Sequence, residues 1–260
     1  LTSLSAQFNL LSLPADEFPV LYPLIGETNF TIRDNILRDL IKKTVFAASN
    51  DEARPVFTGA LLEVVDSEVL MVATNTHRLA LKKENLDNIT NNIKVIIPSK
   101  ILNELARIMV SEIPSPIKIT CHHNQISFSF DNIYIISRII EGQFPDYQRV
   151  IPPNFATTVA IKTADFSSAV ERVSLISRDG DYNVVKLAFR NNEILITSNN
   201  PEVGKAEESI AANIEGNELE IAFNAKYIVD ILKNIDDEKI FFTLNTPLSP
   251  ASIKPENDEN

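Results

Sequence analysis

Apolar residues recur at helical spacing in four separate segments of this chain. The first segment shows the i, i+3, i+4 pattern of an amphipathic helix most clearly, with one face formed by Ile36, Leu37, Leu40, Ile41 and Val45. The same pattern predicts helices over residues 33–48, 99–110, 163–178 and 225–235. Each helix is expected to begin at a residue whose side-chain oxygen can cap free backbone N–H groups: Thr31, Ser99, Thr163 and Asn224.

Short runs that are apolar throughout, or that alternate between apolar and polar residues, separate the helices and are typical of strands. Alternation is clearest from Ile126 to Phe130. The runs predict strands at 56–65, 69–74, 78–83, 117–121, 125–130, 133–140, 239–244 and near 251–254. A further short strand precedes each helix, at 29–32, 94–97, 159–161 and 219–222. The chain therefore repeats a β-α-β-β-β unit of about 65 residues, which predicts an α+β fold with two units in each domain.

Two Phe-Pro pairs set the expected domain boundaries. Phe18-Pro19 and Phe144-Pro145 are separated by the same number of residues as the second and fourth helices. We therefore expect residues 1–18 to be the end of a preceding domain, residues 19–152 to form one complete domain, and residues 153–260 to form a truncated second one. On this interpretation the sequence is a fragment of a longer protein.

The distribution of charge matters more than its sum. The net charge is −11, which by itself argues against a nucleic-acid partner. The four predicted helices nevertheless carry ten basic and six acidic residues, so the acidic excess lies in the strands and loops. If the helices share one wall, that wall would be positive while the exterior repels DNA. Judged from charge alone, an ordinary solvated helical face is the preferred interpretation, and the positive wall is the alternative.

Other chemistry has little support in the sequence. The single cysteine, Cys121, excludes an internal disulfide and fits a reducing cytoplasm, and no apolar run reaches the roughly 18 residues of a membrane span. Cys121-His122-His123 lacks a second ligand cluster, so we expect exposed imidazoles on a strand and no metal. Arg178-Asp179-Gly180-Asp181 is expected to be a helix-to-strand turn. The sequence contains neither a Gly-x-Ser-x-Gly elbow nor a phosphate-binding loop, so we expect no catalytic residue and no cofactor.

Two longer segments carry a family resemblance. Residues 73–80, which include Thr74-Asn75-Thr76-His77-Arg78-Leu79, and residues 142–152, which include Phe144-Pro145-Asp146-Tyr147, resemble the bacterial DNA polymerase III beta sliding clamps. Those proteins carry Thr-Asp-Gly-His-Arg-Leu and Phe-Pro-Asp-Tyr-x-Arg-Val-x-Pro stretches at this separation. Residues 198–202 and 222–227 resemble matching points of the family's third domain. The resemblance covers essentially the whole chain.

The resemblance implies a DNA-clamp fold in which helices line the inside of a ring and antiparallel sheets form the outside. It implies a non-catalytic processivity factor for DNA strand elongation, located in the bacterial cytoplasm and without a membrane association. The expected partners are double-stranded DNA, bound without sequence preference, the DNA polymerase III catalytic subunit, the clamp loader and other proteins with a clamp-binding motif. The full-length protein would close head to tail into a homodimeric ring.

The family's partner-peptide pocket lies between its second and third domains. Carried over by position, the implied pocket residues are Thr74, His77, Arg78, Leu79, Pro145, Arg149, Val150, Asn224, Tyr227, Leu248 and Pro250. The resemblance further implies that Arg54, Lys100 and Arg107 face DNA, and that Leu175 and Ile176 lie at the protomer interface.

Three departures from the family pattern stand out. The family's apolar C-terminal stretch, which completes the pocket wall, is not in this sequence, so we expect the fragment to bind peptides poorly. Asn75-Thr76 replaces the common Asp-Gly, which predicts a less tight turn, and Pro55-Val56 stands where some relatives carry aromatic residues that touch DNA. Two alternatives stay open beside the clamp: a repeat scaffold that binds peptides but not DNA, and a hydrolase that uses His77.

Overall fold

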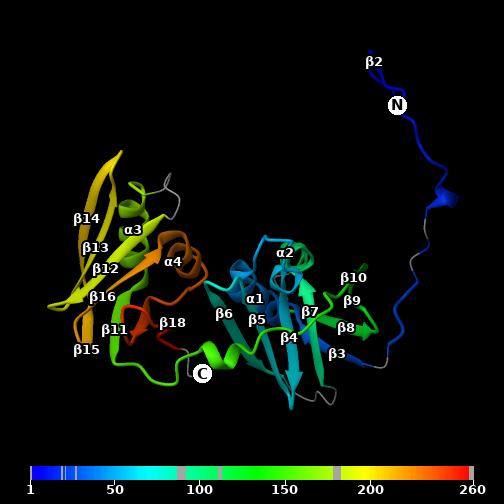
Figure 1. Ribbon diagram of the computed structural model, residues 1–260. Helices are drawn as coiled ribbons and strands as arrows, with labels where there is room; N and C mark the ends of the chain where they lie inside the picture. Colours follow the sequence, from blue (N-terminus) through cyan, green and yellow to red (C-terminus); the bar gives the residue numbers. More distant parts are fainter. Residues whose placement is uncertain are drawn as a thin grey trace.

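The computed structural model describes residues 2–18, 20, 22–26, 28–86, 92–110, 113–177 and 183–257. These residues form two α+β modules that lie side by side, preceded by an N-terminal segment that extends away from both (Figure 1). That segment contains a two-stranded hairpin, β1 (Thr2–Ser3) with β2 (Ala6–Gln7), and a short 3-10 helix, η1 (Ala15–Glu17). Within the part of the chain described, no helix is both long and apolar enough to cross a membrane.

Module 1 is built from two helices and two antiparallel four-stranded sheets. Its helices are α1 (Asp34–Thr44), continued by the 3-10 turn η2 (Val45–Ala47), and α2 (Ser99–Ile108). One sheet has the order β6-β5-β4-β7, formed by Leu79–Asn85, Glu68–Thr74, Gly59–Val65 and Ile93–Pro98. The other has the order β10-β9-β8-β3, formed by Ile133–Arg138, Gln125–Phe130, Pro116–His122 and Thr28–Arg33.

Module 2 repeats this plan with α3 (Thr163–Ser174) and α4 (Ala225–Leu232). One sheet has the order β14-β13-β12-β16, formed by Gly204–Ala211, Glu193–Asn200, Val184–Arg190 and Leu219–Asn224. The other has the order β15-β11-β17-β18, formed by Asn213–Gly216, Thr157–Lys162, Lys239–Leu244 and Ser252–Pro255. The predicted α+β fold of repeated units is therefore confirmed, and the last unit, β16-α4-β17-β18, has two strands after its helix in the described residues. The sequence pattern did not locate β12, β13 and β14 by residue, and β15 is a strand beyond the predicted unit.

The first strand of each unit pairs with the other unit of its module. β3 pairs with β8, where Phe30 lies opposite Ile119, and β7 pairs with β4, where Ile96 lies opposite Leu61. The same exchange joins β11 to β17 and β16 to β12 in module 2. Because each unit completes its partner's sheet, one unit alone would leave unpaired strand edges, and the two fold as one body.

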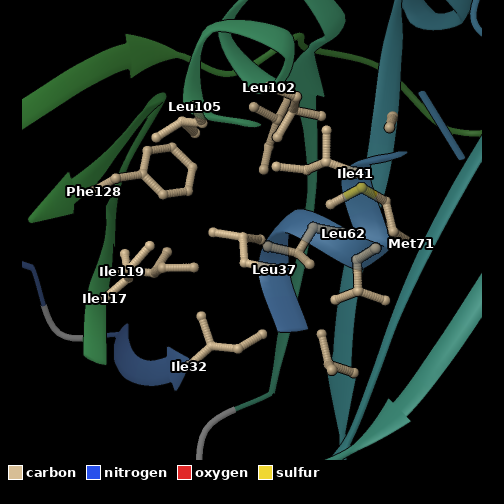
Figure 2. Close-up of a cluster of buried hydrophobic side chains, with 14 of the residues drawn as sticks. Ile32, Leu37, Ile41, Leu62, Met71, Leu102, Leu105, Ile117, Ile119 and Phe128 are labelled. Carbon is tan, nitrogen blue, oxygen red and sulfur yellow. The ribbon is translucent and has the colours of Figure 1, made fainter. Parts of the chain in front are cut away.

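The helices pack on the sheets through the apolar face that their periodicity predicted. Figure 2 shows Leu37 and Ile41 of α1 beside Leu102 of α2, between side chains from both sheets such as Met71 and Phe128. All five are at most 1% exposed, and burying such a side chain contributes roughly 1.5–3 kcal/mol. A separate core, which includes Phe166 of α3 and Phe242 of β17, holds module 2 together.

Three of the four predicted helix caps are wrong. Thr31 is paired within β3, while Ser99 and Thr163 are themselves the first residues of their helices. Each of these helices follows its strand directly. The first N–H group of α1 donates to the carbonyl oxygen of Ser115, just before β8, and that of α3 donates to the carbonyl oxygen of Glu238, just before β17. Only the Asn224 cap is confirmed: its side chain accepts the Lys226 N–H at 2.9 Å.

Two predicted strands are shorter in the structure. Residues 56–58 belong to the 3-10 helix η3 (Pro55–Thr58), in which Pro55 supplies the fixed φ angle that favours a helical start. At the other end of the module, β10 stops at Arg138, short of the predicted residue 140, and only an isolated bridge joins Ile140 to Ile96. This bridge directs residues 139–156, which we call the linker, over the outer face of the sheet β6-β5-β4-β7.

The linker is anchored in a small apolar cluster on that outer face. Its Phe144 and Tyr147, each 7% exposed, pack with Leu61, Leu70, Val72 and Ile96 of the sheet. The linker then forms the 3-10 helix η4 (Tyr147–Val150) before it enters β11. The sheet is therefore buried on both faces, by the helices inside and by the linker outside.

Candidate functional site

The turn between β5 and β6 holds three of the predicted pocket residues in a fixed arrangement. The Thr74 hydroxyl donates to the carbonyl oxygen of Arg78 at 2.7 Å, and the Asn75 side-chain oxygen accepts the N–H groups of His77 and Arg78 at 3.1 and 3.0 Å. Thr76 has a φ of 76°, in the left-handed region that a β-branched residue rarely adopts. The expectation of a looser turn was wrong, because the side chains of Thr74 and Asn75 close it and Thr76 takes up the strain.

Arg78 crosses from module 1 to module 2. One of its terminal nitrogens donates to the Asp230 carboxylate of α4 at 2.7 Å, and the other donates to the carbonyl oxygen of Phe46 in η2. The guanidinium lies between two rings, 4.6 Å from the centroid of Tyr227 and 5.4 Å from that of Phe46. The side chain is only 10% exposed, so this contact is shielded from water and from screening by salt.

His77 and Tyr227 complete the contact between the modules. Their rings stack, with centroids 6.4 Å apart and an angle of 21° between the planes. The structure thus brings Thr74, His77 and Arg78 of one turn together with Tyr227, about 150 positions later in the sequence. Asn224 lies at the beginning of the same helix as Tyr227 and fixes its first turn by capping it.

The remaining predicted pocket residues lie on or beside the linker and in one loop of module 2. Leu79 packs against the cluster that contains Phe144 and Tyr147, which places it next to the linker segment that carries Pro145 and Val150. Val150 is 55% exposed, and Arg149 is paired with Asp146 at 2.8 Å on the surface. Leu248 and Pro250 lie in the exposed loop between β17 and β18, where Leu248 is 97% exposed.

A hollow of about 350 Å³ opens between the modules, on the side that carries the helices. Its wall is mainly polar and comprises Val45, Phe46, Ala48, Asn50, Arg78, Ser99, Asn103, Lys226, Asp230, Lys233 and Asn234. Asp230 is the functional candidate that the sequence did not single out. Four residues after Lys226, it has the spacing of an ordinary ion pair within one helix, and nothing local indicates its second partner, Arg78, 152 positions away.

The predicted DNA-facing residues are all exposed. Lys100 and Arg107 are seven positions apart on α2 and therefore lie on the same face, opposite the buried Leu102 and Leu105. Arg54 precedes η3 and is held by Asp51 at 3.3 Å, with its guanidinium 5.5 Å from the Phe57 ring. Leu175 and Ile176 follow α3, and Leu175 is 57% exposed.

Carboxylates neutralise part of the positive charge that the helices carry. Five helical cations each lie within ion-pair distance of an acidic side chain: Lys43, Arg107, Arg172, Lys226 and Lys233. Over the described ranges, Arg33, Arg38, Lys42 and Lys100 have no such partner, and Arg178 lies outside them. A strong positive field would therefore depend on the unpaired cations, since surface ion pairs add little net charge at a distance.

The metal alternative gains no support from the geometry. The expectation that all of Cys121-His122-His123 is strand was wrong, because β8 ends at His122 and His123 turns the chain with a φ of 49°. Burial raises the pKa of the Cys121 thiol to about 11, so the metal-binding thiolate is disfavoured. Where the chain is described, no three His, Cys, Asp or Glu side chains gather to hold a metal ion. The Arg178–Asp181 turn lies outside the described residues.

The hydrolase alternative would require a nucleophile or carboxylate beside His77. Instead the imidazole is exposed and stacks on the Tyr227 ring, and across the described residues its side chain forms no hydrogen bond to a serine or a carboxylate. A general base needs such a partner within about 3 Å. The arrangement at His77 is therefore suited to recognition through flat rings and a cation, not to proton transfer.

Comparisons with known proteins agree over the length of the chain. The model of the DNA polymerase III beta subunit, central domain, matches residues 31–146, and that of its C-terminal domain matches residues 148–260. The beta sliding clamp of Staphylococcus epidermidis is 38% identical over 261 residues, which cover 100% of this chain and 69% of that protein.

Solved structures give the same result. A crystal structure of the DNA polymerase sliding clamp from Bacillus subtilis matches with a TM-score of 0.91 and 38% identity, over 99% of this chain and 68% of that one. The sliding clamp of Pseudomonas aeruginosa bound to griselimycin matches with a TM-score of 0.89 and 32% identity, over 95% of this chain and 67% of that one. The chain therefore belongs to the beta subunit family of DNA polymerase III, the beta sliding clamps.

Proposed function

We propose that this protein is a DNA sliding clamp, a processivity factor that encircles duplex DNA and tethers the replicative polymerase to it. The agreement of the whole fold with the B. subtilis clamp, at a TM-score of 0.91, carries the proposal. The family is the non-catalytic subunit of DNA polymerase III, so any transferase activity belongs to the assembly. The proposed location is the bacterial cytoplasm, at replication forks.

We propose the following domain organisation: residues 1–18 end a preceding clamp domain, residues 19–152 form the central domain, and residues 153–260 belong to the third. The matched ranges of the two family models, which meet between residues 146 and 148, support this division. The full-length protein is proposed to form a homodimeric ring closed head to tail. The exposed Leu175 and the adjacent Ile176 would then be covered by the neighbouring protomer.

The proposed DNA contact is diffuse and electrostatic. Lys100 and Arg107 project from the exposed face of α2, and Arg54 lies on the exposed loop before η3. Contacts of this kind to phosphates are independent of sequence and weaken steeply with salt, which allows a ring to slide while it stays topologically linked. The acidic balance of the rest of the chain would keep DNA from binding to the outside.

The proposed partner site, the partner-peptide pocket, lies beside the hollow between the modules and shares only Arg78 with its wall. Leu79 and the linker residues Pro145 and Val150 provide its apolar surface, and His77, Arg78 and Tyr227 provide flat polar and aromatic groups. A short peptide with apolar anchors, from the polymerase, the clamp loader or a repair protein, fits this combination. The griselimycin-bound state of the P. aeruginosa clamp, whose fold this chain shares, supports the presence of a ligand site in this fold.

A binding experiment tests the pocket directly. Purified chain is titrated with labelled griselimycin by fluorescence anisotropy, using wild type, His77→Ala and the matched control His122→Ala. We expect His77→Ala to weaken binding by about fivefold to tenfold, because stacking on an aromatic ring contributes roughly 1 kcal/mol. The control, at the far end of module 1, should bind like wild type. Equal affinity of all three proteins would reject His77 as a pocket residue.

A DNA experiment tests the clamp itself. The protein extended by its preceding domain is loaded onto circular DNA that is then cut once. A ring should remain on the circle and slide off the linear product. Equal retention on both forms would favour the scaffold alternative, in which no DNA is encircled.

A further inference from the structure

The carboxylate of Asp230 links the two modules to each other and to the proposed pocket. It accepts hydrogen bonds from Arg78 of module 1 and from Lys226 of its own helix, each at 2.7 Å. The side chain is 22% exposed. Burial alone would raise the pKa of Asp230, but the hydrogen bonds from Lys226 and Arg78 bring it below its usual value. Asp230 therefore stays ionised and available as an acceptor at any neutral pH.

Arg78 depends on this single carboxylate. Within the described residues Asp230 is its only acidic partner, and its Nε is buried without a hydrogen bond. The Arg78 side chain is 10% exposed, so removal of its counter-ion would leave a largely buried positive charge without compensation, which is unfavourable. Such an arginine would leave its place between the Phe46 and Tyr227 rings in order to reach solvent.

The position of Arg78 in turn determines that of His77. The link is the Tyr227 ring: the Arg78 guanidinium lies 4.6 Å from its centroid, and the same ring stacks on His77, whose backbone the Asn75 side chain holds in the turn. Tyr227, which stacks on both His77 and Arg78, precedes Asp230 by three residues and lies on the same side of α4. One carboxylate thus controls both sides of the contact.

We propose that Asp230 is a positioning residue of the partner-peptide pocket: through Arg78, it holds the His77–Tyr227 stack in the geometry that a bound partner meets. The part of this inference that concerns partner binding rests on the proposed function of the pocket. The part that concerns the stack does not, and the two can be measured separately.

The stack is measured without any ligand. The chain contains three histidines, so the imidazole signals of His77, His122 and His123 can be resolved and assigned by nuclear magnetic resonance. Asp230→Asn, which keeps the shape of the side chain and removes its charge, should shift the His77 signal as the Tyr227 ring moves away. The other two signals should stay in place, because they lie on the β8–β9 turn of module 1.

The pocket is measured by griselimycin affinity in the same proteins. Asp230→Asn should weaken binding about tenfold, the equivalent of roughly 1.4 kcal/mol. Lys226→Met is the matched control, because it removes the other, 65% exposed partner of the same carboxylate and should change affinity less than about twofold. In an Arg78→Met background, Asp230→Asn should cause no further loss.

Two outcomes would overturn the proposal. One is a His77 signal that is unchanged in Asp230→Asn. The other is a loss of affinity on Asp230→Asn that is as large in the Arg78→Met background as in wild type, since Asp230 would then act without Arg78. If Asp230→Asn alone fails to fold, the Arg78→Met/Asp230→Asn protein, which buries no unpaired charge, provides the comparison with Arg78→Met. If wild type fails to bind griselimycin, the proposed pocket fails in this chain, while the His77 signal still decides whether Asp230 positions the stack.

Discussion

Replacing Phe144 by alanine should free the linker without unfolding the protein. Phe144 lies on the linker, not in the sheet, and contacts a cluster of side chains on the outer face of module 1. It is 7% exposed, and Tyr147, three residues later, is the only other linker side chain among the buried members of that cluster. The substitution therefore removes about half of the apolar anchor that holds Pro145 and Val150 beside Leu79.

The size of the effect follows from the buried side chain. Phe→Ala substitutions in a core cost about 3–5 kcal/mol. Here the linker can undock while both cores stay intact, so most of this cost should appear as local opening. A change of about 3 kcal/mol raises the population of the open linker by roughly a hundredfold. If opening and closing are fast, proteolysis of the linker should accelerate by the same factor.

Limited proteolysis gives the measurement. Trypsin can cleave after Arg149, which is 85% exposed and lies within η4, and the rate of this cleavage is followed by mass spectrometry. Phe128→Ala is the matched control, because Phe128 is fully buried in the inner core and its loss should lower the global free energy of unfolding without selective cleavage at Arg149. Phe144→Ala should also weaken griselimycin binding.

A large change in the global free energy of unfolding, with little change in cleavage at Arg149, would refute the anchoring role of Phe144. If Phe144→Ala lowers the global free energy of unfolding as much as Phe128→Ala, and cleavage after Arg149 rises less than about tenfold, the linker is not held by this anchor. The pocket wall would then be positioned by other contacts, and griselimycin affinity should be unchanged.

Three further changes test separate parts of the structure. Thr76→Gly should raise the melting temperature by a few degrees. The substitution relieves about 1–2 kcal/mol of left-handed backbone strain, which exceeds the roughly 0.5–1 kcal/mol that glycine costs in conformational entropy. A lower melting temperature would show that Thr76 is unstrained. The double substitution Lys100→Glu/Arg107→Glu should reduce both the retention of the loaded ring on DNA and the slope of its salt dependence, and it should leave griselimycin affinity unchanged. The control Lys118→Glu, on the sheet face opposite the helices, should change neither the retention nor the slope. If the control lowers retention as much as the double substitution does, the helices carry no specific DNA face. In denaturant titrations, wild type should lose stability relative to Cys121→Ala as the pH rises from 9 to 11. Burial raises the pKa of the folded thiol from 9.0 to about 11, so in this range the thiol ionises more readily in the unfolded chain and favours unfolding. Stability curves of the two proteins that run parallel over this pH range would contradict the prediction.

The elements of the fold could be predicted because their signals are local. Leu37, Leu40 and Ile41 repeat at the period of a helix, and Ile126, Phe128 and Phe130 at that of a strand, and all six are buried. Errors occurred where another part of the chain supplies the hydrogen bond. Thr31 is not a cap, since Ser115, more than 80 residues away, accepts the first N–H of α1.

The candidate site was predicted only in part, for the same reason. The motifs around residues 74–79 and 144–150 identified most of its members through resemblance, and the structure brings His77 and Arg78 together with Tyr227. Asp230 and Phe46 were missed. Their roles depend on contacts with Arg78, which no periodicity, spacing or motif along the chain records.

The sequence by itself determined where most of the helices and strands lie, which of their faces are apolar, and that one unit is repeated, because these properties depend on neighbours within a few positions. Only the tertiary structure decided that the units exchange their first strands, that the linker covers the outside of a sheet, and that one carboxylate of module 2 holds an arginine of module 1. These features arise from surfaces that meet after the local elements have formed. Their free energies come from burial and from charge pairing between residues distant in the chain, so they become visible only when both partners are in place.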